Sequence, residues 1–121
     1  MGYLGRATVP ARRQRTTSIE RAAAAARANA LLESLLDEQQ RRDRRRTRRW
    51  WVQTDRGWLQ MGGSPHDIRY RPSADPGTEW SLCVVTTDAR LPRGDVWSSL
   101  LLSATVYPDE FFRVAHRRRV R

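Results

Sequence analysis

Lysine is absent from this chain of 121 residues, and all 23 of its basic residues are arginine. This absence excludes a P-loop lysine, a Schiff-base lysine, a Ser-Lys catalytic pair and every nuclease motif that contains lysine. Cysteine is nearly absent as well: with Cys83 alone, the chain forms neither an internal disulfide nor a zinc cluster built from cysteines. Several familiar routes to catalysis and to a structural metal are therefore closed.

The chain also lacks a long apolar run. No stretch reaches the ~20 apolar residues that a membrane-spanning helix needs, so we expect no membrane span. Arg12 and Arg13 ahead of an alanine-rich stretch resemble a twin-arginine export signal, and the arginine-rich start resembles an organellar transit peptide, but Glu20 and Arg27 interrupt the apolar segment. Export and organellar import are therefore not favoured, and we expect the protein in the cytoplasm or within a nucleoprotein particle.

Charge of the two signs is unevenly distributed along the chain. The net charge is +10, and residues 1–17, 41–49 and 113–121 together carry an excess of 15 positive charges, so the remainder is mildly acidic. A GC-rich genome accounts for the choice of arginine over lysine. Segregated charge, however, is typical of a polyanion-binding protein with basic extensions.

Proline and glycine are missing from residues 18–49, and most residues of this stretch are strong helix formers. Thr17 and Glu20 match a capping box, in which each side chain accepts a hydrogen bond from the other residue's backbone amide. The sequence therefore predicts one long helix within residues 17–49. Pro10 and two glycines predict that the preceding residues 1–16 form a disordered basic arm.

An apolar stripe with helical spacing lies on the first half of this predicted helix. It comprises Ala24, Ala28, Leu31, Leu32, Leu35 and Leu36. The stripe spans too few heptads to predict a coiled coil. Three alternatives stay open: the stripe packs on the protein's own globular part, pairs with a second copy of the chain, or binds another protein through residues 18–40.

Arginine dominates the second half of the predicted helix, where residues 41–49 hold seven arginines and a single acid, Asp43. Mutual repulsion between these charges indicates a polyanionic partner or a fully solvated segment. Residues 41–51 resemble the arginine-rich motifs of viral and phage RNA-binding peptides, short helices that enter an RNA groove and contact its phosphates. The run lacks an asparagine or glutamine to read a base edge, so we do not expect sequence-specific readout from it. The candidate nucleic-acid contacts are Arg12, Arg13, Arg15, Arg41, Arg42, Arg44, Arg45, Arg46, Arg48, Arg49, Trp50, Arg117, Arg118 and Arg119.

Five tryptophans are available for core packing or for stacking on bases. Trp58, Trp80 and Trp97 fall in expected strands, and we assign them to the core. If Trp51 faces the sheet, Trp50 faces the arginines, where it stacks on a guanidinium or on a base.

Residues 50–112 change to the period of β-strands and predict a small antiparallel β domain. A hairpin with a glycine-containing turn is expected over residues 51–61, and further strands over residues 67–71, 80–87 and 96–107. In the last of these stretches, Trp97, Leu100, Leu101 and Ala104 also fit the spacing of a helix. Pro108 and the two acids after it start either a short helix, which we favour, or a turn into a last strand. The expected fold is α+β, with a basic arm, a long helix, an antiparallel sheet of four or five strands, a short C-terminal helix and a basic tail at residues 113–121.

Residues with catalytic or metal-binding potential are scattered through the sequence. His66 and His116 lie far apart and have no partners at metal-ligand spacing. The aspartates fall in predicted turns, where their side chains bind the backbone. We therefore expect no enzyme activity, no cofactor and no bound metal.

These patterns favour a non-enzymatic, arginine-rich nucleic-acid-binding protein within a larger nucleoprotein assembly. RNA is slightly favoured over DNA, because arginine on all faces of a helix suits a deep groove. Two alternatives stay open. One is an assembly or adaptor protein of a large particle, such as a virus, that binds proteins through the apolar stripe. The other is a small DNA-binding regulator or accessory factor that dimerises through it.

Overall fold

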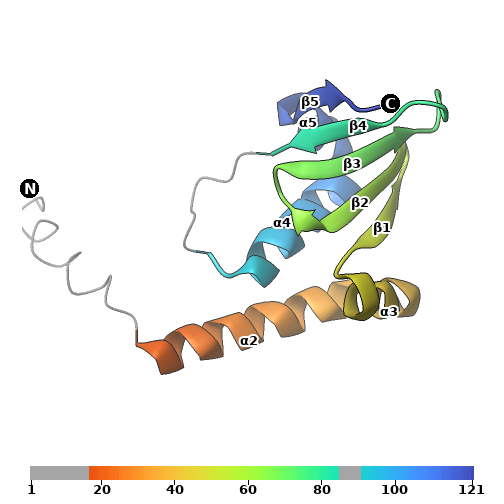
Figure 1. Ribbon diagram of the computed structural model, residues 1–121. Coiled ribbons are helices and arrows are strands. Elements are labelled where there is room, and N and C mark those ends of the chain that lie inside the picture. Colours follow the sequence, from red (N-terminus) through yellow and green to blue (C-terminus); the bar gives the residue numbers. More distant parts are fainter. Residues whose placement is uncertain (1–16, 85–90) are drawn as a thin grey trace, which may run out of the picture.

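A computed structural model describes residues 17–84 and 91–121 as a sheet backed by helices, with a long helix along one end (Figure 1). In chain order the elements are α2 (Ser18–Leu35), α3 (Glu38–Thr47), β1 (Trp50–Thr54), β2 (Gly57–Ser64), β3 (Asp67–Pro72), β4 (Trp80–Cys83), α4 (Arg93–Val106), α5 (Pro108–Val114) and β5 (His116–Arg119). The α+β prediction is confirmed. The predicted disordered arm at residues 1–16 lies outside the described residues, as does the end of the strand predicted over residues 80–87.

The predicted capping box opens α2. Thr17 Oγ1 accepts a hydrogen bond from the Glu20 amide (3.0 Å), and Glu20 Oε1 accepts one from the Thr17 amide (3.2 Å). Two of the four amides that a helix start leaves without partners are thereby satisfied. The start of the helix is confirmed at Ser18.

The single helix predicted over residues 17–49 is wrong, because the chain breaks at Leu36 and Asp37, both of which have extended backbone angles. A second capping box causes the break. Asp37 Oδ1 accepts a hydrogen bond from the Gln40 amide (2.8 Å), and Gln40 Oε1 accepts one from the Asp37 amide (2.9 Å). Asp37 therefore starts a new helix, α3, instead of continuing α2.

The sheet is antiparallel throughout, and its strand order follows the chain, β1-β2-β3-β4-β5. The predicted hairpin is confirmed as β1 and β2. Within the basic tail predicted at residues 113–121, His116–Arg119 form an edge strand that pairs with β4. At an edge, arginines complete the backbone ladder while their side chains remain in water.

The strand predicted over residues 96–107 is wrong: α4 spans Arg93–Val106. Its buried residues include Trp97, Leu100, Leu101 and Ala104, which lie on one face of a helix. The helix favoured after Pro108 is confirmed as α5. These two helices cover one face of the sheet, and Figure 1 shows them behind it.

The core lies between that face of the sheet and the helices. Leu59, Ile68 and Leu82 from the strands are fully buried, and Trp50 packs edge-on against Trp97 of α4 with 5.8 Å between ring centroids. The predicted positions of two tryptophans are reversed. Trp50 is 1% exposed and belongs to the core, whereas Trp58, assigned to the core, is 45% exposed.

The apolar stripe of α2 packs on the protein's own globular part. Leu32 and Leu36 join the hydrophobic core, and Ala28 is 3% exposed. A Cβ on Gly94 of α4 would lie 2.6 Å from the carbonyl of Ala28, so α2 and α4 cross with their backbones nearly in contact. Ala24 and Leu35 are half-buried, and Leu31 remains 48% exposed. None of the described helices is long and apolar enough to cross a membrane.

Candidate nucleic-acid interface

A cleft of about 730 Å³ opens where α3 ends, beside the end of β2 and the start of α4. We call it the arginine cleft. Its lining comprises Asn29, Arg44, Arg45, Thr47, Arg48, Arg49, Trp50, Gly62, Gly63, Arg93 and Trp97. Five arginines thus contribute to the lining of one hollow, and the described lining includes no carboxylate.

A left-handed turn at the end of α3 places Arg48 and Arg49 along this cleft. Arg48 has φ 67°, and its amide donates to the carbonyl of Arg44 (2.8 Å). Thr47 Oγ1 then accepts a hydrogen bond from the Arg49 amide (3.2 Å) and donates one to the Asp43 carbonyl (2.9 Å). The turn stops the helix and sends the chain into β1.

Two glycines of β2 make room for this turn. A Cβ on Gly62 would meet the carbonyl oxygen of Arg48 at 2.2 Å, and Gly62 has φ +108°, which other residues rarely adopt. The guanidinium of Arg49 lies over Gly63, where a Cβ would be 3.1 Å from its atoms. Because Gly62 and Gly63 have no side chains, β2 leaves room for the backbone of Arg48 and for the guanidinium of Arg49.

Part of the α3 charge is neutralised inside the protein. Arg44 Nη1 lies 2.7 Å from Glu33 Oε2, Arg45 lies 3.9 Å from the same carboxylate, and Arg44 also donates to Asn29 Oδ1. Arg41 Nε donates to the carbonyl oxygen of Glu33 (2.8 Å). The sequence indicated that the charge of residues 41–49 is balanced only by solvent or by a polyanion. This expectation is wrong on the side that faces α2, where Glu33 of the protein itself balances part of the charge.

Three further arginines of the cleft are not held in ion pairs within the described part of the chain. Arg48, Arg49 and Arg93 form no ion pair with any acid among residues 17–84 and 91–121. Arg93 is the first residue of α4, whose N-cap residue, Pro92, makes no side-chain cap, so the positive end of the helix dipole lies beside the same hollow. The cleft thus holds positive charge outside ion pairs from two distant parts of the chain.

The remaining candidate contacts are dispersed. On α3, Arg42 and Arg46 are exposed, and Arg42 lies 3.9 Å from Glu38. Arg117 to Arg119 lie in β5, at the edge of the sheet opposite β1 and α3. Arg12, Arg13 and Arg15 lie outside the described residues. Trp50 cannot stack on a base while it is 1% exposed, so its assignment as a contact is wrong in this fold.

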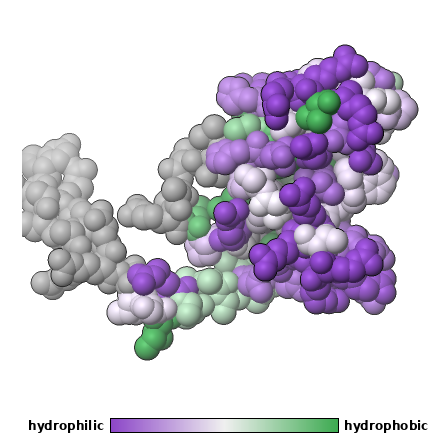
Figure 2. All heavy atoms as spheres, in the orientation of Figure 1, coloured by the Kyte–Doolittle hydropathy of each residue, from purple (hydrophilic) through white to green (hydrophobic). Residues whose placement is uncertain are grey.

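The helix-free face of the sheet carries polar and aromatic residues that we did not assign to any site. This face looks toward the viewer in Figure 1, and Figure 2 shows that hydrophilic residues extend across it and over α3. The guanidinium of Arg71 lies 4.6 Å from the ring centroid of Trp51. The alternation of buried Val52 and Leu59 with Trp51 and Trp58 was the sequence signal that places both indoles on this face.

A buried carboxylate organises the same face. Glu79, with a side chain 8% exposed, accepts hydrogen bonds from Arg69 Nη1 and Arg71 Nε, both at 2.9 Å. The hydrogen bond from Arg71 is the largest influence that lowers the pKa of Glu79, and together with that from Arg69 it outweighs burial, which raises the pKa. Asp67 likewise accepts from Arg69 and from Ser81 Oγ (2.6 Å), and these bonds lower its pKa.

Within the described part of the chain, no group of three metal-binding side chains is close enough to hold an ion. The chain matches no protein-family model, no curated protein and no solved structure. The class that fold and geometry define is therefore an α+β protein with a cationic cleft beside an open sheet face.

Proposed function

We propose that the protein binds nucleic acid by holding backbone phosphates in the arginine cleft. The observation that carries this proposal is that Arg48, Arg49 and Arg93, which form no ion pair with the described acids, line one hollow whose described lining has no acid. Uncompensated guanidiniums in a concave site attract anions, since low-dielectric walls focus the field. The protein's net charge of +10 extends this attraction beyond the cleft.

Phosphate suits the cleft for two reasons. A guanidinium presents a planar fork of donors that binds phosphate oxygens in pairs. In addition, the N-terminus of α4 beside Arg93 favours negative charge through its dipole. A nucleic-acid backbone supplies phosphates at regular intervals, so it can continue from the cleft onto exposed arginines of α3 such as Arg46.

The adaptor and dimeric-regulator functions both require an exposed apolar stripe on α2, and less of this stripe is exposed than the sequence indicated. Ala28, Leu32 and Leu36 are buried within the protein, so they are not available to a protein partner or to a second copy without unfolding this contact. Leu31 remains exposed. The absence of catalysis, the larger assembly and the slight preference for RNA stay predictions.

Charge-matched variants test the proposal. In the cleft variant, Arg48→Gln with Arg93→Gln, both substitutions keep an unbranched polar side chain and remove charges that no ion pair holds. We expect affinity for a labelled oligonucleotide to fall by at least about tenfold, because two charged hydrogen bonds are lost. The slope of log affinity against log salt should become shallower by about 1.4 on single strands and about 1.8 on duplex. Fluorescence anisotropy at several salt concentrations measures both quantities.

The control removes the same charge elsewhere. Arg27→Gln with Arg113→Gln lies on exposed parts of α2 and α5, outside the cleft. This control should bind nearly as tightly as the unaltered protein. Equal losses in both variants would mean that net charge alone determines binding and would contradict a role for the cleft.

A further inference from the structure

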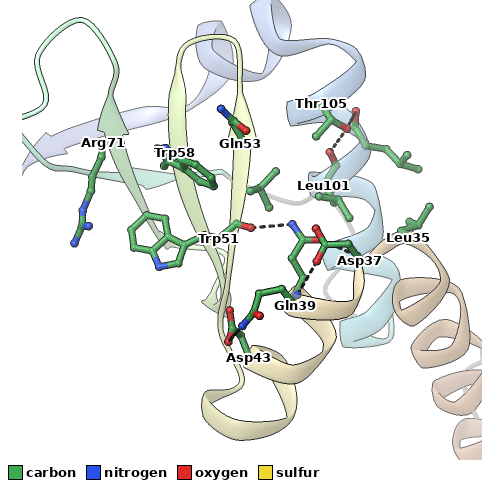
Figure 3. A pocket seen from close by; sticks show the side chains of 13 residues that line it. Leu35, Asp37, Gln39, Asp43, Trp51, Gln53, Trp58, Arg71, Leu101 and Thr105 are labelled. Atoms are coloured by element: carbon green, nitrogen blue, oxygen red, sulfur yellow. Dashed lines mark hydrogen bonds between the residues drawn. The ribbon is translucent and has the colours of Figure 1, made fainter.

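The open face of the sheet displays two indole rings where a sheet of this size would be expected to bury them. Trp51 pairs with Gln60 in the β1–β2 ladder, and Trp58 pairs with Gln53 two positions further along, so the two tryptophans are diagonal neighbours on one face. Figure 3 shows both rings on the side of the hairpin away from Leu101 and Thr105 of α4. We call Trp51, Gln53, Trp58, Gln60 and Arg71 the stacking platform.

Exposure of Trp58 is not explained by a lack of space inside the protein. Burial of a large apolar side chain stabilises a fold, and the same chain buries Trp50 and Trp97 almost completely. Yet Trp58 is 45% exposed on a regular strand. Among the described residues, no aromatic ring or guanidinium lies over its indole. One large aromatic surface is thus left open to a ligand.

Trp51 is held in place while Trp58 stays open. The Arg71 guanidinium lies 4.6 Å from the Trp51 ring centroid, and Arg71 Nε donates to the buried Glu79 carboxylate at 2.9 Å. Arg69 donates to the other oxygen of Glu79. Because Glu79 fixes Arg71 and Arg71 covers Trp51, this part of the platform is preorganised and loses little entropy on binding.

Arg49 connects the platform with the arginine cleft. It lines the cleft, its guanidinium packs over Gly63 of β2, and its charge helps to lower the pKa of Asp67 on the open face. A polyanion held in the cleft therefore passes Arg49 as it reaches the sheet. The positive charge of the cleft and the adjoining indoles together favour a ligand that carries both negative charge and aromatic rings.

We propose that the stacking platform binds unpaired bases of a single-stranded nucleic acid whose phosphates occupy the arginine cleft. This inference rests on the proposed function and narrows it, because bases inside a duplex are stacked on one another and cannot lie on an indole. Stacking accepts any base. The amides of Gln53 and Gln60 beside the rings supply donors and acceptors for base edges.

Substitution of the open indole tests the proposal. Trp58→Ala should weaken binding of oligouridine and oligodeoxythymidine by roughly 5- to 150-fold, the range found for loss of one stacked base, and leave duplex binding unchanged. Trp58→Phe should retain part of the single-strand affinity, because phenylalanine also stacks. Comparison of the two oligonucleotides distinguishes RNA from DNA as the source of the bases.

Tyr107→Ala is the matched control, since Tyr107 is an aromatic residue that is 69% exposed and lies outside the sheet. It should leave single-strand affinity unchanged. Denaturation by urea should give Trp58→Ala nearly the stability of the unaltered protein. If Trp58→Ala is destabilised instead, the readouts are the affinity of Trp58→Phe and the quenching of tryptophan fluorescence when the single strand binds. Quenching supports the stacking platform, and the absence of quenching overturns the proposal.

The outcomes separate this inference from the proposed function. Loss of binding in the cleft variant together with unchanged single-strand binding in Trp58→Ala would overturn the platform and leave the cleft intact. Equal weakening of single-strand and duplex binding by Trp58→Ala would also overturn it. Failure of the unaltered protein to bind either polymer would overturn the proposed function and this inference together.

Discussion

Arginine residues of this protein fall into two groups when each side chain is considered alone. Arg44, Arg69 and Arg71 are held by carboxylates, whereas Arg48 and Arg93 form no ion pair with the described acids. The same residue type therefore stabilises the fold at one position and remains available to an anion at another. Composition alone cannot separate the groups, because the distinction depends on which carboxylate the fold brings near.

Glu79 provides a test at the residue scale. Its pKa lies below the ordinary 4.5, chiefly through the hydrogen bond from Arg71. The unfolded chain therefore binds more protons than the folded one as the pH falls below about 4.5, so the contribution of Glu79 to stability is present above that pH and is lost below it. Glu79→Gln should reduce the free energy of unfolding at pH 7 by about 1.5–3 kcal/mol and make its decrease below pH 4.5 less steep.

Urea denaturation between pH 3 and pH 7 measures this effect. Glu110→Gln is the control, because its partner Arg113 is also exposed and such pairs contribute only about 0–1 kcal/mol. A pH profile of Glu79→Gln that parallels that of the unaltered protein would show that Glu79 does not carry this linkage.

Residue-level prediction from the sequence failed most clearly for the tryptophans. Trp50 and Trp51 are adjacent, so a strand must place them on opposite faces, but the sequence does not say which face the helices cover. Once α4 packs against Trp50, Trp51 and Trp58 must point away from the core. The sequence predicts that Trp50 and Trp51 lie on opposite faces of the sheet, but it does not predict which of the two indoles is buried.

Local signals decided which elements were predictable. The hairpin, the start of α2 and the helix after Pro108 each follow from a turn, a capping box or a helix-start pattern that acts within a few residues. Asp37 and Gln40 carry the same type of capping signal, which we overlooked because the surrounding residues favour a continuous helix. Residues 96–107 carry both a strand alternation and a helical spacing, and packing against α2 resolved the conflict.

The crossing of α2 and α4 gives the prediction at the element scale. Gly94→Ala places a methyl group 2.6 Å from the carbonyl carbon and oxygen of Ala28, both backbone atoms that cannot rotate away. The helices must separate, and overpacking of this kind costs about 1–3 kcal/mol. Alanine favours helix formation over glycine by about 1 kcal/mol, so the net destabilisation should fall toward the lower part of that range.

Gly77→Ala is the matched control, because a Cβ at Gly77 meets no atom within 4 Å. Urea midpoints should decrease for Gly94→Ala and stay the same or increase slightly for Gly77→Ala. An increase for Gly94→Ala would mean that α2 does not lie as close to α4 as described.

The whole molecule separates an apolar interior from two exposed surfaces, the arginine cleft and the open face of the sheet. The charge segregation along the sequence predicted a basic surface, and residues 44–49 do line the cleft in part. Arg93 was missed because it lies far along the chain in an acidic region and reaches the cleft only through the packing of α4 against α2. A site assembled from distant segments of the chain can be identified only when the fold is known.

The salt dependence of nucleic-acid binding by the unaltered protein tests phosphate recognition most directly. With four or more arginines on phosphates, each counting for about 0.7 on a single strand, we predict a slope of log affinity against log salt of about −3 or steeper. Anisotropy with oligouridine between about 50 and 200 mM salt covers the range in which such binding weakens strongly. A flat slope, or no binding at the lowest salt concentration, would contradict nucleic-acid binding through the arginine cleft.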